Sequence, residues 1–208
     1  GDYTENYVII GGTACDIIME ENDFTPRATK DIDLILVVEA LSPEFVKQFW
    51  KFIKLGNYED QQKSTEEKNY YRFIKPEDNS FPYQLEFFSR IPDAIDFEGE
   101  GHLVPIPVEG DLSSLSAVLM DDDYYHYMKS NSSLEVGVHI ANLNALICLK
   151  SKAYIDIQDR LNKGSNEDKK HLKKHKNDVF KLAVLLTTES SFELPEKLKN
   201  DMLEFMER

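Results

Sequence analysis

The feature that most constrains the fold is a short apolar run that ends in two glycines and leads directly into a helical pattern. Residues 7–10 are apolar and β-prone, and Gly11 and Gly12 follow them. From Thr13 to about residue 22 the apolar residues recur at helical spacing, so we expect a strand, a tight turn and a helix with Thr13 as its N-cap. Such a turn lets the backbone approach a ligand closely, and the N–H groups at a helix N-terminus favour phosphate.

The second informative segment holds two acidic residues separated by one apolar residue. Residues 31–38 alternate as a strand, so Asp31 and Asp33 lie on the same face. Neighbouring carboxylates repel one another, whereas Mg²⁺ takes one or two carboxylates together with substrate phosphates. The pair therefore indicates either a Mg²⁺ site or two solvated acids at the start of a strand. The glycine turn upstream favours the metal site.

The rest of the chain predicts an α+β fold: a mixed sheet followed by a helical C-terminal part. We expect an α/β core over residues 1–140 and helices over residues 141–208 that pack on it. Ser42 and Pro43 have the positions of an N-cap and a first helical residue. The expected elements are helices at about 43–55, 141–161, 166–187 and 194–207, strands at about 70–74 and 83–88, irregular structure over 91–110 with a short strand near 102–104, and a short helical segment within 112–128 followed by a tyrosine cluster.

Charge and cysteine content narrow the classes of protein. The formal net charge is −14, which argues against a protein that wraps nucleic acid by charge alone. Residues 141–208 carry 13 Lys/Arg and 11 Asp/Glu, so a local basic surface remains open there. Cys15 and Cys148 lie in apolar stretches and have no metal-type spacing, which predicts reduced thiols in a cytoplasmic protein. No window of 18 apolar residues predicts a transmembrane helix, and the first residues are not typical of a secretion signal.

The glycine turn and the two acids together resemble the nucleotidyltransferase superfamily that includes DNA polymerase β. The matching segments are Val8-Ile9-Ile10-Gly11-Gly12-Thr13-Ala14 and Arg27-Ala28-Thr29-Lys30-Asp31-Ile32-Asp33-Leu34. They look most like the AbiEii-type abortive-infection toxin branch. Lys150, and Asp178 within residues 173–180, resemble two later positions of that branch. The resemblance is strongest over residues 7–38.

The resemblance implies transfer of a nucleoside monophosphate from an NTP to an acceptor. Asp31 and Asp33 would bind Mg²⁺ at a site for one or two ions, with Glu86 as the third carboxylate. Gly11, Gly12, Thr13 and Lys150 would bind the nucleotide. The acceptor is open among RNA, a protein and a small molecule, and the branch implies an antitoxin partner.

Two other interpretations stay open. The fold could serve as a catalytically inactive nucleotide-binding or protein-interaction module, or Asp31 and Asp33 could be accidental in an unrelated α+β protein. The Lys/His run at 169–176 is typical of a solvated helix face, and Tyr124, Tyr125 and Tyr127 are typical of packing.

Overall fold

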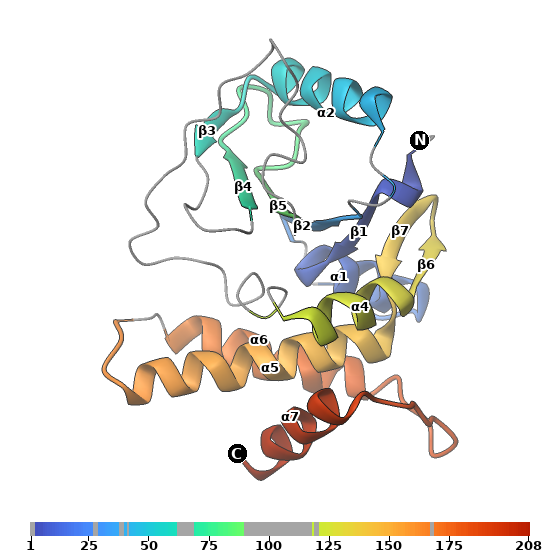
Figure 1. Ribbon diagram of the computed structural model, residues 1–208, viewed down its shortest axis with the longest axis vertical. Helices are drawn as coiled ribbons and strands as arrows, with labels where there is room; N and C mark the ends of the chain where they lie inside the picture. Colours follow the sequence, from blue (N-terminus) through green and yellow to red (C-terminus); the bar gives the residue numbers. More distant parts are fainter. Residues whose placement is uncertain are drawn as a thin grey trace. The chain divides into compact units, whose positions relative to one another are not determined.

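The computed structural model describes residues 3–26, 29–37, 40, 42–61, 69–89, 118, 121–166 and 169–208. Within them the chain is α+β, with a mixed seven-stranded sheet and a C-terminal helical part (Figure 1). A short 3-10 helix, Thr4–Asn6, precedes the first strand. The strands are β1 Tyr7–Ile10, β2 Asp31–Leu36, β3 Glu59–Gln61, β4 Asn69–Ile74, β5 Gln84–Ser89, β6 Ser132–Glu135 and β7 Val138–Ala141. The α-helices are α1 Gly11–Glu21, α2 Pro43–Gly56, α4 Asp122–Ser130, α5 Leu143–Asn162, α6 Lys169–Ala183 and α7 Glu196–Glu207.

The sheet has the strand order β3-β4-β5-β2-β1-β7-β6. Strand β2 lies between an antiparallel neighbour, β1, and a parallel neighbour, β5. Strand β4 is antiparallel to both β5 and β3. The two acids of β2 therefore lie near the middle of the sheet, with paired strands on both sides.

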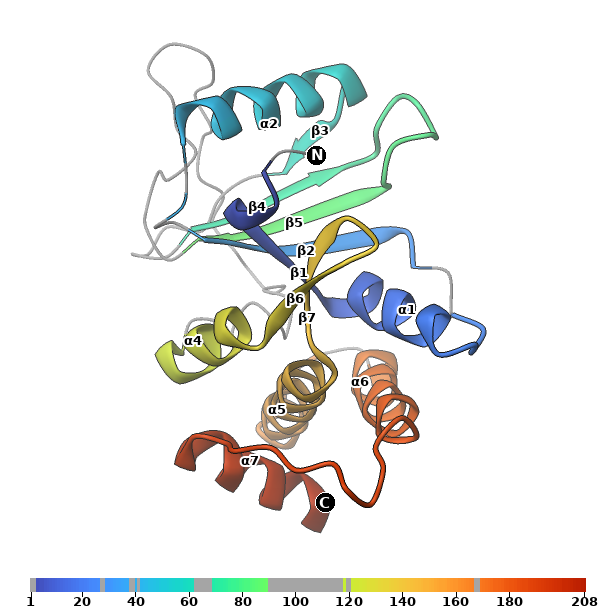
Figure 2. The same ribbon diagram turned by 90° about the vertical axis from the view of Figure 1, so that its right-hand side faces the viewer.

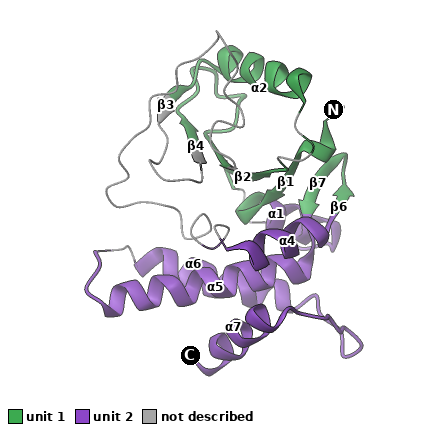
Figure 3. Ribbon diagram, viewed as in Figure 1, with its two compact units in different colours: residues 1–13, 27–111, 133–140 green, residues 14–26, 112–132, 141–208 purple. Residues whose placement is uncertain are grey.

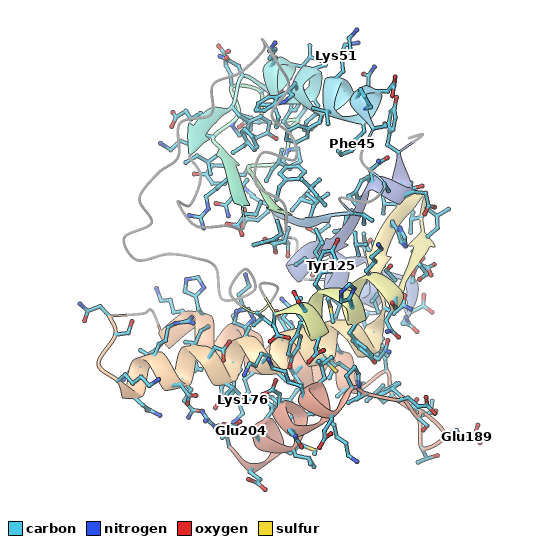
Figure 4. All side chains as sticks on the ribbon, in the orientation of Figure 1. Phe45, Lys51, Tyr125, Lys176, Glu189 and Glu204 are labelled. Atoms are coloured by element: carbon cyan, nitrogen blue, oxygen red, sulfur yellow. The ribbon has the colours of Figure 1, made fainter. Side chains whose placement is uncertain are left out.

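Helix α2 covers one face of this sheet (Figure 2). The Ser42 hydroxyl accepts the Phe45 N–H at 3.2 Å, and Pro43 is the first helical residue, as the sequence predicts. Phe49 packs edge-on against Phe73 of β4 and Phe87 of β5, with ring centroids 5.7 and 4.7 Å apart. Edge-to-face rings are a favoured arrangement in cores. In Figure 4, Phe45 lies on the buried side of α2 and Lys51 on its exposed side.

The chain divides into two compact units (Figure 3). Unit 1 holds residues 1–13, 27–111 and 133–140, and therefore most of the sheet and α2. Unit 2 holds residues 14–26, 112–132 and 141–208. One boundary between the units falls at residue 140, and most of α1 and all of α4 belong to the same unit as the C-terminal helices.

Unit 2 is organised around α5, whose buried side chains include Leu146 and Ile155. Tyr154 of α5 packs edge-on against Phe205 of α7 at 5.3 Å between ring centroids. Tyr124 of α4 is fully buried and donates its hydroxyl to Asp201 of α7 at 2.9 Å. Tyr125 and Tyr127 are also buried, which confirms that the tyrosine cluster packs, although it lies within α4 rather than after a helix.

The predicted strands 31–38, 70–74 and 83–88 correspond to β2, β4 and β5, and the predicted C-terminal helices to α5, α6 and α7. The sequence-based prediction was wrong in three respects: the start of one helix, the end of another, and three missed strands. Helix α1 begins at Gly11, so Thr13 is not its N-cap. Helix α6 ends at Ala183, four residues early. Strands β3, β6 and β7 were not predicted, because all three are short and β6 is largely polar. The expected strand near 102–104 lies outside the described residues.

Neither Cys15 nor Cys148 forms a disulfide, and both are buried. Burial, with Asp201 nearby, raises the pKa of Cys148 to about 12. Among the described residues, none of the helices combines the length and apolar character that crossing a membrane requires.

Candidate functional site

The sheet register brings predicted site residues from distant parts of the sequence into one row. Asp33 of β2 pairs with Glu86 of the parallel strand β5, and Glu86 pairs with Arg72 of the antiparallel strand β4. On the other side, Asp33 pairs with Ile10 of β1, immediately before Gly11. Residues that pair across strands share a face, so Asp33, Glu86 and Arg72 lie on one side of the sheet. Since Phe73 and Phe87 alternate with them and pack on α2, this is the face away from α2.

Gly11 lies so close to the Asp33 carboxylate that a side chain on residue 11 would force Asp33 to move. A Cβ built on Gly11 would lie 1.8 Å from Asp33 Oδ2. Gly11 also has a φ of +69°, which L side chains rarely adopt. The glycine turn thus places the backbone at the start of α1 directly beside one of the two predicted metal ligands.

The first turn of α1 is tied to the start of β2 by a side chain. The Thr13 hydroxyl donates to the backbone carbonyl of Asp31 at 2.6 Å. Gly12 is the second residue of α1 and is buried. Asp31, in turn, pairs in register with Gln84 of β5 and is half-buried, as is Asp33. Thr13 therefore fixes the position of Asp31 relative to the glycine turn, a role the sequence did not suggest.

Glu86 has a different environment from the two aspartates. Its carboxylate is buried, and one oxygen, Oε1, accepts from Arg72 Nε at 2.8 Å and from Gln84 Nε2 at 2.9 Å. The Arg72 side chain is 23% exposed, whereas that of Glu86 is 3% exposed. A buried charge needs a partner, and an arginine supplies a strong one. Arg72 and Gln84 are the residues that sequence reasoning missed; only the register of the β4–β5 hairpin could have revealed them.

Mg²⁺ fits part of this arrangement. Asp31 and Asp33 stand two residues apart on one strand face, and the Asp33 carboxylate lies against the backbone of Gly11. Two neighbouring carboxylates are ligands that suit Mg²⁺. In the part of the chain that the structure describes, no three His, Cys, Asp or Glu side chains are grouped to hold a metal ion. The geometry therefore brings together Gly11, Asp31 and Asp33, with Glu86 in the same row but engaged by Arg72.

Lys150, the other predicted nucleotide ligand, belongs to unit 2. Its Nζ lies 3.0 Å from Asp178 Oδ2, and the two side chains are 1% and 7% exposed. The residue pair that the sequence singled out is thus a buried ion pair between α5 and α6. Binding of phosphate by Lys150 stays a prediction.

The Lys/His run of α6 is largely exposed, apart from the buried His175. Lys176, labelled in Figure 4, lies over the Tyr154 ring with its Nζ 5.2 Å from the ring centroid. This contact resembles a cation–π interaction within unit 2.

Comparison with known proteins adds no relative: no family model, curated protein or solved structure matches the chain.

Proposed function

We propose that the chain is a metal-dependent nucleotidyltransferase, with unit 1 as a nucleotidyltransferase-type core, that transfers a nucleoside monophosphate from an NTP to an acceptor. The observation that carries the proposal is the close approach of Gly11 to Asp33, with Glu86 paired to Asp33 in the next strand. Gly11, Asp33 and Glu86 come from three separate segments that the resemblance pointed to, and they lie close together at one sheet face. An accidental pair of acids would not require a glycine of positive φ beside it.

In this proposal the aspartates bind the metal ion and the glycine turn binds the triphosphate. Asp31 and Asp33 would hold Mg²⁺, which would neutralise charge on the phosphates and activate the attacking oxygen. Gly11 and Gly12 let the triphosphate approach the N-terminus of α1, where backbone N–H groups favour anions. Thr13 keeps this N-terminus in place through the Asp31 carbonyl. Catalysis of this kind depends on positioning and charge stabilisation.

The acceptor belongs to one of three classes: RNA, a protein or a small molecule. In the same proposal the enzyme is a toxin that an antitoxin restrains, which the resemblance of residues 7–38 implies, and it is cytoplasmic, which the two cysteines indicate. The net charge of −14 favours a small acceptor, whereas the exposed lysines of α6 favour RNA.

A second candidate function is a catalytically inactive nucleotide-binding or protein-interaction module. The ion pair between Glu86 and Arg72 favours it, because a carboxylate that already accepts two hydrogen bonds at one oxygen has less capacity to bind metal or accept a proton. This module would bind an NTP through Gly11 and Asp33 without turning it over.

The test is titration calorimetry of the four NTPs with Mg²⁺, on the wild type and on Asp31→Asn/Asp33→Asn. We expect one NTP to bind only when Mg²⁺ is present, and its heat to disappear in the double variant. Glu59→Gln/Glu77→Gln is the matched control, because it removes two exposed negative charges from the same unit and should bind like the wild type.

Each outcome decides between the candidates. Metal-dependent binding followed by label transfer from the α-phosphate of that NTP supports the transferase. Binding without transfer to RNA, protein or small-molecule acceptors supports the inactive module. A folded wild type that binds none of the four NTPs contradicts the transferase and leaves the protein-interaction module.

A further inference from the structure

Helix α6 has two opposite faces, and only one of them packs within unit 2. The residues of the packed face recur at helical spacing and are buried against α5: His175, Asp178, Val179 and Leu182. The opposite face, here called the outer stripe, is exposed along its length and consists of Lys173, Asn177, Phe180, Lys181 and Val184. Val184 lies just beyond the end of the helix. The outer stripe is therefore open for contacts with another molecule.

The charge of α6 is the reverse of that of the chain as a whole. The helix contains six lysines and a single acid, Asp178, whereas the formal net charge of the chain is −14. The Asp178 carboxylate lies on the buried face, 3.0 Å from Lys150 Nζ. Lys173 and Lys181 place positive charge on either side of Phe180. The outer stripe is thus a local basic surface on an acidic chain.

The outer stripe is also apolar towards its C-terminal end. Phe180 is 58% exposed and Val184 is 66% exposed. The Phe180 ring contacts that of Phe205 in α7, with centroids 6.4 Å apart, and the next residue of α7, Met206, is 67% exposed. Large apolar side chains that are exposed near one another and bordered by polar residues are typical of protein–protein interfaces. The ligand of this surface should therefore offer apolar groups as well as negative charge.

These properties fit an acidic protein segment better than a nucleic acid or a membrane. A nucleic acid or an anionic bilayer is an extended negative surface, which the net charge of −14 repels. A short segment interacts mainly with charges within about 8 Å at physiological salt, and so mainly with the lysines. Helix α6 contains no arginine, the residue that pairs best with phosphate, and Val184 offers a phosphate no hydrogen bond.

We propose that the outer stripe of α6 binds an acidic amphipathic helix of a partner protein. Carboxylates of that helix pair with Lys173 and Lys181, and its apolar residues cover Phe180 and Val184. Side chains three and four residues apart share one face of a helix, so such a partner can match the spacing of the outer stripe. The inference concerns unit 2 alone and does not depend on turnover of an NTP by unit 1.

The test measures binding of a labelled peptide to the full chain by fluorescence anisotropy at physiological salt. The probe is a helical peptide of about 18 residues, long enough to hold a helix, with leucines at helical spacing flanked by glutamates. We expect saturable binding of one peptide per chain. Lys173→Glu/Lys181→Glu should weaken it by roughly 10-fold or more, because two attractive contacts become repulsive. Phe180→Ser should weaken it roughly 10-fold, because an apolar contact is lost.

Three controls separate a specific surface from general attraction of charge. Lys47→Glu/Lys51→Glu makes the same charge change at two exposed lysines of α2 and should leave the affinity unchanged. A peptide with its leucines replaced by serines should bind roughly 10-fold more weakly. Lys173→Gln/Lys181→Gln removes the two charges without adding acids to α6, and far-UV circular dichroism checks that each variant keeps its helices.

Four results would overturn the proposal. One is equal weakening by the α2 variant, because binding would then follow overall charge. Another is the absence of saturable binding to a folded wild type. The third is tighter binding of a single-stranded polyuridylate oligonucleotide, or of phosphatidylserine vesicles, through the same two lysines, which would assign the outer stripe to that ligand. The fourth is a dimer in sedimentation that Lys173→Glu/Lys181→Glu disperses, which would identify a second copy of the chain as the occupant.

Discussion

Each unit of the molecule contains a buried acid paired with a cation, Glu86 with Arg72 and Asp178 with Lys150, and the two pairs differ in how exposed the cation is. In unit 2, Lys150 and Asp178 join α5 to α6 with both side chains at most 7% exposed. In unit 1, Glu86 is equally buried, but its partner Arg72 is 23% exposed. The Lys150–Asp178 pair is shielded from solvent on both sides, whereas in the other pair Arg72 is partly exposed on the sheet face.

The difference teaches where to look for function when the structure is the main guide. Both pairs join segments that are distant in sequence, and both would attract attention by charge and burial alone. Only the Arg72–Glu86 pair has a glycine turn and a second acid, Asp33, in contact with the same row. An ion pair with one partly exposed partner, next to a residue held at positive φ, is a better candidate for a functional site than an ion pair that is buried on both sides.

The largest expected effect on stability comes from breaking the buried Lys150–Asp178 ion pair. Asp178→Ala removes the carboxylate that faces the buried Lys150 ammonium ion, and should lower the free energy of unfolding by about 3–5 kcal/mol. Urea unfolding followed by far-UV circular dichroism, which the helices dominate, measures it. Glu86→Ala should cost less, about 1–3 kcal/mol, because Arg72 can turn towards water.

A double variant tests the reason for this difference. Lys150→Met/Asp178→Leu replaces the pair by apolar residues of similar size and should recover most of the stability that Asp178→Ala loses. If Asp178→Ala costs no more than Glu86→Ala, the contrast between the two pairs is wrong.

The next effect concerns the glycine turn beside Asp33. Gly11→Ala should destabilise unit 1 by about 2–4 kcal/mol, since it adds a clash with Asp33 to an unfavourable φ. Fluorescence of the single tryptophan, Trp50 of α2, reports unfolding of this unit.

Gly137→Ala is the matched control for Gly11→Ala. Gly137 has a φ of +77°, but an added Cβ would meet no atom within 4 Å. It should therefore cost only the conformational part, about 1–2 kcal/mol. Equal losses in the two variants would show that the approach of Gly11 to Asp33 is not tight.

A smaller effect is expected when the hydrogen bond from Tyr124 to Asp201 in unit 2 is removed. Burial raises the pKa of the Tyr124 hydroxyl, and Asp201 raises it further, so this group donates throughout the physiological range. Tyr124→Phe should cost about 1.5–3 kcal/mol, the range for a hydrogen bond to a charged group. Lys152, at 3.1 Å, remains as a partner of Asp201. A double-mutant cycle with Asp201→Asn measures the coupling, and a coupling near zero would contradict the bond.

The smallest effect is a pH dependence at the exposed end of α4. Burial pushes the pKa of Asp121 up, but the hydrogen bond and charge of Lys197 and the N–H groups of Asp123 and Tyr124 outweigh it, so its pKa is lowered from 3.8. A lowered pKa means that the stabilisation is present above about pH 5 and is lost as the pH falls through 3.8 and below.

Asp121→Asn keeps the helix cap but removes this acid-dependent part, which should be at most about 1 kcal/mol for so open a pair. Unfolding free energies of the wild type and the variant should therefore converge between pH 6 and pH 3. Lys197→Met should give the same result, and a gap that widens towards pH 3 would contradict the assignment.

Much of the fold could be predicted because local signals were strong. Ser42 and Pro43 mark the start of α2, and the alternation from Asp31 marks β2. Strands β6 and β7 carried no such signal, because the turn between them uses Val136 at a φ of +49° before Gly137. A β-branched residue is rare at positive φ, so the sequence hides this turn.

The candidate site was predictable only in part. Asp31 and Asp33 follow from spacing, because two residues apart on a strand fixes their common face. Glu86 followed from the family resemblance, but its partner Arg72 depends on which residues of β4 and β5 pair, and no local pattern sets that register. Thr13 was expected to bind phosphate, whereas its bond to the Asp31 carbonyl is a contact between segments 18 residues apart.

The register of β2, β4 and β5 has one further consequence, for assembly errors. Asp33, Glu86 and Arg72 alternate along their strands with Leu34, Phe87 and Phe73, which are buried against α2 or beside it. A slip of one residue in β2 or β4 would bury the charge of Asp33 or Arg72 on the apolar face and bring a core residue to the more exposed face. Packing of the apolar residues therefore also fixes the alignment of the acids and the arginine. A molecule with a shifted register would be less stable and would not persist in the folded state.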